Sequence, residues 1–457
     1  MKDTRLHIDA IRRLLRRHAK GNLEKVLTKL HPADIALIFR HLNEDERAQV
    51  FLIIPTVEQA AEVLSELDDS IIEEILPDLP MEKILLLMKE LSADDEVAIL
   101  RLLPEELSDK ILTQLKGKES EEMEALMAYK EDSAGALMTT EVFALHEDLS
   151  VKDAISSIQT QVNQEMVFYL YVIDDHRRLV GVISLRDLIT SKPGNLLSNI
   201  MTTRVHSVDT DMNQEEVAHV VSRYNILAVP VVDEAHTLLG IITVDDVIDV
   251  IREEATEDFL QMAGAGRDKE IISKNVFDNV KLRIPWLFAS WIGGLLVASI
   301  ISKYETTLGQ VLALVAFLPI ITGMAGNVGT QTSTIIVRGI ATGRVTHQDS
   351  LATVFKEFRV GIILGLLYGL LLGGAGYLVG SLEIMDLGVM TPEQLGITVG
   401  SGIFSAMTIA TTIGAFIPIV LEKLNQDPAI ATGPFVTTAI DIAGVFVYFV
   451  IASFFIF

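Results

Sequence analysis

Five long apolar stretches in the C-terminal part of the chain constrain its fold more than any other feature. They cover roughly residues 285–302, 311–337, 360–380, 395–421 and 429–457. About 20 apolar residues are enough for a helix to cross the hydrocarbon core of a bilayer, and lipid leaves few alternatives to helices. The sequence therefore predicts an all-α, five-helix transmembrane domain at residues 284–457, surrounded by lipid.

Basic residues mark the side of the membrane on which the loops lie. Lys281 and Arg283 precede the first stretch, and four more basic residues follow the second. The charged residues of the loop after the third stretch are all acidic. Because Lys and Arg concentrate in cytoplasmic loops, we expect a cytoplasmic N-terminus and a C-terminus outside the cell.

Asp441 is the only formally charged residue in the five stretches. A carboxylate at the centre of a spanning helix costs roughly 2.5–3.5 kcal/mol, and such residues usually face a partner or a water-filled path. We therefore expect Asp441 to meet a cation. The alternative is a buried aspartate that caps a helix.

The second stretch carries the polar and small residues that are typical of a pore lining. Pro319 frees backbone carbonyls, and the three glycines that follow it allow backbones to approach closely. Asn327 and Gln331 lie one turn apart on one helix face. These features predict that this span lines an aqueous path; a tightly packed helix–helix contact would explain the glycines alone.

The part of the chain before the membrane is strongly acidic. The net charge is −25, and residues 31–110 hold 20 Asp and Glu against 6 Lys and Arg. Such a surface disfavours nucleic acid and suits cations, although a solvated face would look the same. The chain has no cysteine, which excludes thiolate metal sites.

Residues 1–130 contain a repeat of about 24–25 residues that runs from Leu to Pro. Asn43, Asp68 and Ser92 occupy equivalent places, and each precedes acidic residues that favour a helix start. The pattern predicts an all-α domain of helical repeats.

Residues 131–252 contain a second repeat, of a strand, a helix, two strands and a closing helix. Leu137-Met-Thr-Thr-Glu-Val matches Ile200-Met-Thr-Thr-Arg-Val. The pattern resembles a tandem pair of cystathionine-β-synthase-type (CBS) modules of α/β fold, at about 137–195 and 196–252. We expect the closing helix to continue as a connecting helix over 253–283, unless Gly264 and Gly266 break it.

With two membrane motifs added, the chain resembles the MgtE family of bacterial magnesium channels along nearly its whole length. The motifs are Pro-Ile-Ile-Thr-Gly-Met-Ala-Gly-Asn-Val-Gly-Thr-Gln from Pro319 and Thr-Gly-Pro-Phe-Val-Thr-Thr-Ala-Ile-Asp from Thr432. The resemblance implies a homodimer in the cell (inner) membrane, with one pore, Asp441 as its selectivity site and Asn327 in its lining.

The physical chemistry of Mg²⁺ agrees with such a pore. Mg²⁺ prefers octahedral oxygen ligands and gives up water reluctantly, so two Asp441 side chains on one axis would match its charge. We expect backbone carbonyls near Gly433 and the hydroxyls of Thr437 and Thr438 to add outer contacts.

An open pore would overload the cell, because a membrane potential drives divalent ions inward. We therefore expect acidic residues to sense internal Mg²⁺ and to close the pore when ions bridge them. The resemblance implies regulatory Mg²⁺ at the domain boundaries. The candidate sensor residues are Asp94, Asp95, Glu215, Asp246, Asp249, Glu253, Glu254, Glu257, Asp258 and Asp427.

The CBS pair also offers a candidate site for ATP or another adenine nucleotide. Ser184 with Asp187, and Thr243 with Asp246, resemble the ribose-binding pattern of such modules; plain helix capping by Ser184 and Thr243 is the alternative. No nucleophile motif or phosphate loop indicates an enzyme. The other function that the sequence leaves open is a secondary transporter of Co²⁺ or Mn²⁺ regulated by its CBS pair.

Overall fold

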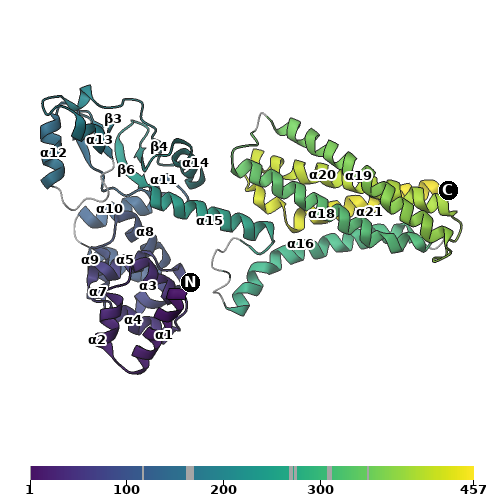
Figure 1. The fold of residues 1–457 in the computed structure, drawn as a ribbon, viewed down its shortest axis with the longest axis horizontal. Coiled ribbons are helices and arrows are strands. Elements are labelled where there is room, and N and C mark those ends of the chain that lie inside the picture. The colour runs from purple at the N-terminus through teal and green to yellow at the C-terminus, as the bar shows by residue number, and fades with distance from the viewer. Residues whose placement is uncertain are drawn as a thin grey trace. The chain divides into compact units, whose positions relative to one another are not determined.

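The computed structural model describes residues 2–115, 118–160, 169–266, 271, 275–305, 311–346 and 349–456. The chain forms two compact units, Met1–Arg252 and Glu253–Phe457. Both are built mainly from helices, as the sequence predicted, and small sheets occur in the first unit (Figure 1).

The first part of the first unit is a stack of short helices in two layers. Odd-numbered helices contact the next odd-numbered one, and even-numbered helices do the same, from α1 to α10. This is the helical repeat that the sequence predicted. The helices are α1 (Lys2–Arg16), α2 (Lys20–Leu27), α3 (Pro32–Phe39), α4 (Glu44–Ile53), α5 (Val57–Ser65), α6 (Asp69–Ile75), α7 (Met81–Met88), α8 (Ala93–Leu102), α9 (Glu105–Gln114) and α10 (Lys118–Met127), with a 3-10 turn η1 (Leu76–Asp78).

The predicted cap residues stand at the predicted helix starts. Asn43 accepts a hydrogen bond from the Glu46 amide at 2.9 Å, and the Glu46 carboxylate accepts one from the Asn43 amide at 3.2 Å. This reciprocal capping stabilises the first turn of α4. Asp68 precedes α6 and instead binds Arg40, at 2.7 and 3.0 Å. Ser92 precedes α8.

The rest of the first unit contains two three-stranded sheets of the same topology. In each, the first strand is parallel to the second and the second is antiparallel to the third. The first module comprises α11 (Ala134–Leu137), β1 (Ala144–His146), α12 (Val151–Thr160), β2 (Tyr169–Ile173), β3 (Leu179–Ser184), α13 (Leu185–Thr190) and η2 (Leu197–Asn199). The second comprises β4 (Val208–Asp209), α14 (Gln214–Tyr224), β5 (Ala228–Val232), β6 (Leu238–Thr243) and α15 (Val244–Met262).

The single connecting helix expected over 253–283 is wrong, and the glycine break that the sequence left open is what the structure has. Helix α15 ends at Met262, and the next long helix begins at Val276. Gly264 and Gly266 have φ angles of +68° and +97°. Side chains rarely adopt such angles, so glycines at these places end the helix readily.

The second unit contains five helices that are long and apolar enough to span a membrane, which confirms the predicted number. The helices overlap the predicted stretches; α16 begins nine and α19 ten residues before the predicted start, and α21 begins five residues after it. The helices are α16 (Val276–Lys303), α18 (Ala313–Ala341), α19 (Ser350–Ser381), α20 (Pro392–Lys423) and α21 (Pro434–Ile456), with a short turn η3 (Pro428–Ala431) before the last.

Helices α18, α20 and α21 form the core of this unit, and α16 packs on α21. Tyr448 is fully buried there, and its hydroxyl donates a hydrogen bond to the Leu314 carbonyl at 2.9 Å. Helix α18 is continuous through Pro319. The core thus fixes α21, the helix that carries Asp441.

Candidate ion pathway and acidic clusters

Asp441 is half-buried and lines a partly open cavity of about 400 Å³ between α16, α18 and α21. Four of the lining residues bear hydroxyls: Ser290, Thr322, Thr437 and Thr438. Oxygen atoms of this kind suit a hydrated hard cation. The structure thus brings together Asp441 and the two threonines that the sequence selected.

Glycines set the spacing of the helices around this cavity. A Cβ atom on Gly293 of α16 would come within 1.9 Å of the Thr438 methyl group, and one on Gly329 of α18 within 2.0 Å of Ile440. Real contacts are never so short, so a side chain at either place would push α21 away. Gly293 itself lines the cavity.

Asn327 and Gln331 lie on a different face of α18. Both side chains are exposed in the single chain, and neither is among the residues around the Asp441 cavity. Added Cβ atoms on Gly323 and Gly326, on the same stretch of helix, would meet nothing within 4 Å. This polar face of α18 is therefore open in the single chain.

Gly433 contacts the end of α15 rather than the Asp441 cavity. A Cβ atom there would lie 3.2 Å from the Met262 carbonyl oxygen, and one on Gly264 would lie 2.9 Å from Pro434. Trp286 of α16 packs edge-on against Phe435, with ring centroids 5.7 Å apart. The end of α15 is therefore seated on the first residues of the helix that carries Asp441.

A first acidic cluster joins the first turns of α8 and α15. Burial raises the pKa of Asp94, and the charge of Asp245 adds to the effect. Among the described residues the Asp94 Oδ1 atom has no hydrogen-bond partner. Burial, followed by the charge of Asp94, raises the pKa of Asp246 to about 7, with smaller effects from Asp245 and Asp95. These carboxylates repel one another at neutral pH.

A second acidic cluster joins the other end of α15 to the loop before α21. Burial, followed by the charges of Asp427 and Glu254, raises the pKa of Asp258 to about 6, while Arg338 opposes the rise. Asp427 also accepts a hydrogen bond from the Ala429 amide at 2.8 Å and so caps η3.

Glu257 takes part in the second cluster and binds its own helix as well. It accepts a hydrogen bond from Gln261 Nε2 at 2.7 Å. The amide oxygen of Gln261 is buried.

Asp94, Asp95 and Asp246 belong to the first cluster, and Glu254, Glu257, Asp258 and Asp427 belong to the second. Both clusters therefore contain predicted sensor residues.

The other predicted sensor residues have partners of their own. Asp249 accepts a hydrogen bond from Arg252 at 3.1 Å, and Glu215 lies 4.0 Å from His219. Glu253 lies on α15 between the two clusters. Within the described part of the chain, no group of three or more carboxylate or imidazole side chains forms a ready-made metal site.

The candidate nucleotide residues cap helices in the structure. Ser184 Oγ accepts a hydrogen bond from the Asp187 amide at 3.1 Å and donates one to its carboxylate at 2.7 Å. Thr243 Oγ1 donates to the Asp246 carboxylate at 2.5 Å. The capping alternative thus describes their contacts in this structure.

Sequence reasoning missed one acidic residue in the membrane part. Glu357 of α19 is only 6% exposed, and Thr332 of α18 donates a hydrogen bond to its carboxylate at 3.4 Å. Its place before the apolar run left it outside the predicted span. The signal that could have found it is the helical spacing that continues upstream to Ser350.

Comparison with known proteins gives matches along most of the chain. A family model described as "Divalent cation transporter" (MgtE) matches residues 318–451, one described as "MgtE intracellular N domain" matches 30–132, and CBS domain models match 134–194 and 197–253. The Bacillus subtilis protein "Magnesium transporter MgtE" is 37% identical over 97% of this chain and 96% of its own length. The Thermus thermophilus protein of the same name is 34% identical over 94% of both.

Two solved structures resemble the part of the chain before the membrane. The soluble part of a magnesium transporter is 30% identical with a TM-score of 0.50, and covers 55% of this chain and 99% of its own. The cytosolic domain of the Mg²⁺ channel MgtE in complex with ATP is 36% identical with a TM-score of 0.51, and covers 53% and 99%.

Proposed function

This chain belongs to the MgtE family of magnesium transporters, whose members are not enzymes, and we propose that it is a Mg²⁺-selective channel for uptake across the cell membrane. The observation that carries the proposal is the position of Asp441, which lies among four hydroxyl-bearing residues in a cavity between three spanning helices. The function is that of a regulated pore, in which carboxylates select the ion and further carboxylates close the path.

The cavity is large enough for an ion that keeps its water. Mg²⁺ holds six oxygen ligands, and six waters at about 30 Å³ each occupy roughly 180 Å³. A cavity of about 400 Å³ accommodates that shell. The ion then meets Asp441 through water, which spares the cost of stripping a tightly hydrated cation.

We propose that two copies of the chain form the pore. One Asp441 supplies a single negative charge, and two related by symmetry would balance one Mg²⁺. The exposed polar face of α18, with Asn327 and Gln331, supports this assembly, because polar side chains do not face lipid readily. The open backbone at Gly323 and Gly326 would permit close approach of a second protomer.

The two acidic clusters support the proposal that internal Mg²⁺ closes the channel. The raised pKa values of Asp246 and Asp258 reflect buried carboxylates next to like charges, and a divalent ion would relieve that repulsion. Mg²⁺ needs only one or two carboxylates in addition to its waters. Ions at these clusters would fix both ends of α15.

The contact of the end of α15 with Gly433 and Pro434 would transmit a movement of α15 to the pore. A shift of α15 would move the start of α21 and with it Asp441. The proposed topology, with the N-terminus in the cytoplasm and the C-terminus outside, would expose both clusters to internal Mg²⁺. The basic residues around the first three spans support that orientation.

We further propose that the CBS pair binds ATP or a related nucleotide. The relative solved with ATP supports this, and so do the hydroxyl and carboxylate pairs of Ser184 with Asp187 and Thr243 with Asp246. A nucleotide would compete with the capping hydrogen bonds that these pairs now make.

Recordings from the purified full chain in a planar bilayer would test the proposed function. We expect single-channel Mg²⁺ currents that persist without a proton gradient and cease when millimolar Mg²⁺ is added on the side of the acidic clusters. Uptake that requires a proton or sodium gradient and shows no unitary currents would instead favour a secondary transporter of divalent cations such as Co²⁺ or Mn²⁺.

A further inference from the structure

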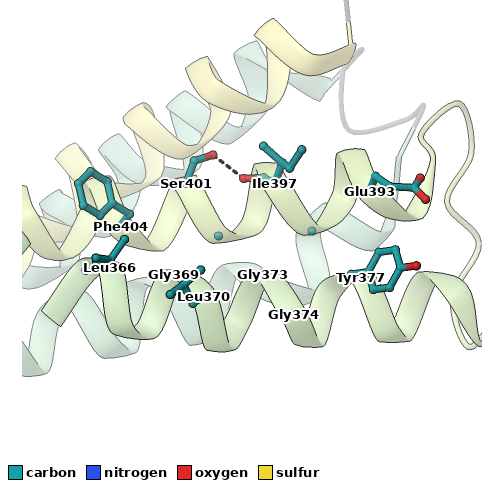
Figure 2. A pocket seen from close by; sticks show the side chains of 13 residues that line it. Leu366, Gly369, Leu370, Gly373, Gly374, Tyr377, Glu393, Ile397, Ser401 and Phe404 are labelled. Atoms are coloured by element: carbon teal, nitrogen blue, oxygen red, sulfur yellow. Dashed lines mark hydrogen bonds between the residues drawn. The ribbon is translucent and has the colours of Figure 1, made fainter. Parts of the chain in front are cut away.

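A second, larger cavity lies on the membrane unit between α19 and α20, with a volume of about 760 Å³. Its lining is almost wholly apolar, and it shares no residue with the Asp441 cavity. We call this open cavity the groove. Glycines form its floor, leucine, isoleucine and phenylalanine side chains form its walls, and Figure 2 shows how these residues lie along the two helices.

The groove exists because the two helices touch through their backbones. A Cβ atom on Gly369 would lie 2.9 Å from the Gly400 carbonyl oxygen, and one on Gly373 would lie 2.8 Å from that of Gly396. No side chain stands on this seam, so the surface above it is hollow. Ser401 does not make it polar, because its hydroxyl donates to the Ile397 carbonyl of its own helix at 2.6 Å.

The walls of the groove are exposed apolar side chains within spanning helices. Leu366, Leu370 and Ile397 are 57%, 71% and 55% exposed. In a bilayer such a face contacts lipid chains or another helix. The groove runs from Gly365 to Tyr377, which at a rise of 1.5 Å per residue is about 18 Å. This length is close to half of the roughly 30 Å hydrocarbon core, and so fits one leaflet.

Two polar residues of the lining, Tyr377 and Glu393, stand at one end of the groove. Figure 2 shows Tyr377 of α19 and Glu393 of α20 at the same end of the two helices, with both polar tips directed toward that end. The loop that joins these helices adds Glu383 and Asp386 and contains no basic residue. A head group that carries an amine complements this end, because an ammonium can donate to the Glu393 carboxylate while the Tyr377 hydroxyl donates to a phosphate oxygen.

We propose that the groove between α19 and α20 is a binding site for one membrane phospholipid with an amine-bearing head group, its acyl chain lying over the glycine seam. A neighbouring transmembrane helix fits less well, because it would need contacts along the whole bilayer rather than one leaflet. An anionic lipid without an amine would bring its negative charge next to the acidic side chains at the head-group end and would offer them no cation. The site is independent of the ion pathway proposed above, since the two share no residue.

Variants that fill the groove test the site without disturbing the seam. A Cβ atom on Gly374 would meet nothing within 4 Å, so Gly374→Leu places a side chain in the groove. Ser401→Leu fills it from the opposite helix. Ala375→Leu is the matched control, because Ala375 is exposed one residue further along α19 and is not part of the lining.

The assay is native mass spectrometry of the full chain, reconstituted in vesicles of palmitoyl-oleoyl phosphatidylethanolamine and phosphatidylglycerol in equal amounts and then extracted in mild detergent. We expect the wild type and Ala375→Leu to retain phosphatidylethanolamine. Either groove variant should retain it about tenfold less, the loss expected when about two methylene contacts are blocked. Glu393→Gln should remove the preference for phosphatidylethanolamine over phosphatidylglycerol.

Three results would overturn the proposal. Equal retention by the wild type and both groove variants would mean that the groove holds no lipid. A preference for phosphatidylglycerol, or one that Glu393→Gln leaves unchanged, would refute the head-group assignment. A change in the number of chains per particle in the groove variants would show that a second copy occupies the groove. Unchanged Mg²⁺ flux in the same variants verifies that they fold.

Discussion

Replacing Asp94 by asparagine should stabilise the first acidic cluster at neutral pH when Mg²⁺ is absent. The Asp94 and Asp246 carboxylates share a half-buried place between α8 and α15, and each lacks a cationic partner among the causes that set its pKa. Asparagine keeps the shape and one oxygen of aspartate but removes the charge. The substitution therefore removes repulsion while it leaves the packing of α8 in place.

The magnitude follows from the pKa of Asp246, which rises from 3.8 to about 7. At 1.36 kcal/mol for each pKa unit, the folded protein loses about 4 kcal/mol when this group is charged. Burial is the largest cause and the charge of Asp94 the second, so Asp94→Asn removes only part of this cost, on the order of 2 kcal/mol.

The sign of the pH dependence follows from proton binding. Between about pH 4 and 7 the folded state holds a proton on Asp246 that the unfolded state has released, so stability falls as pH rises through this window. The gain in folding stability from Asp94→Asn should therefore be complete at pH 8 and absent near pH 4. Mg²⁺ should shrink the gain, because an ion already relieves the repulsion in the wild type.

Amide hydrogen exchange in α8 and the first turn of α15 of the full chain measures this effect. Without Mg²⁺ at pH 8, protection should rise by up to about 30-fold in Asp94→Asn. Asp109→Asn is the control, since Asp109 is an exposed residue of α9 with the same charge. If Asp94→Asn lowered protection by the same factor at pH 5 and pH 8, the carboxylates would not repel and the reasoning would be refuted.

Three further predictions concern other parts of the molecule. Because the pKa of Asp258 is raised to about 6, the Mg²⁺ concentration that closes the wild-type channel should fall as pH rises through 6, and Asp258→Asn should flatten this dependence in flux titrations. Gly293→Ala should cost about 1–3 kcal/mol in thermal unfolding, because its Cβ clashes with Thr438, whereas Gly294→Ala, in open space, should not. Ser184→Ala should remove a helix cap worth about 1 kcal/mol and weaken ATP binding by calorimetry; unchanged affinity would exclude this hydroxyl from the site.

The fold was largely predictable because its strongest signals are local. Hydropathy located the five spans, and cap residues such as Asn43 and Ser92 located helix starts, since both depend on residues adjacent in sequence. The end of α15 could not be predicted, because it depends on a contact between residues far apart in the sequence. Gly264 and Gly266 allow a break but do not require one, and the contact of Gly264 with Pro434 that accompanies the break joins residues far apart in the chain.

The residues selected from the sequence for the candidate site remain predictions, and the partners that the structure gives them could not be predicted. Helical spacing placed Asn327 and Gln331 on one face of α18, but spacing does not say what that face meets, and the cavity of Asp441 lies elsewhere. Likewise the acids of α15 were evident, whereas the pairing of Asp246 with Asp94 depends on the packing of α8. Glu357 was missed because a hydropathy threshold ended the predicted span short of it.

The most direct test of the account is Mg²⁺ flux into liposomes by Asp441→Asn, which keeps the side-chain shape and removes the charge. Loss of a charge-assisted contact worth about 1.5–3 kcal/mol predicts a fall of roughly 10- to 100-fold, together with loss of preference for Mg²⁺ over monovalent cations. Glu383→Gln in the loop after α19 should transport at the wild-type rate. Wild-type flux with unchanged selectivity in Asp441→Asn would contradict the claim that this carboxylate selects the ion.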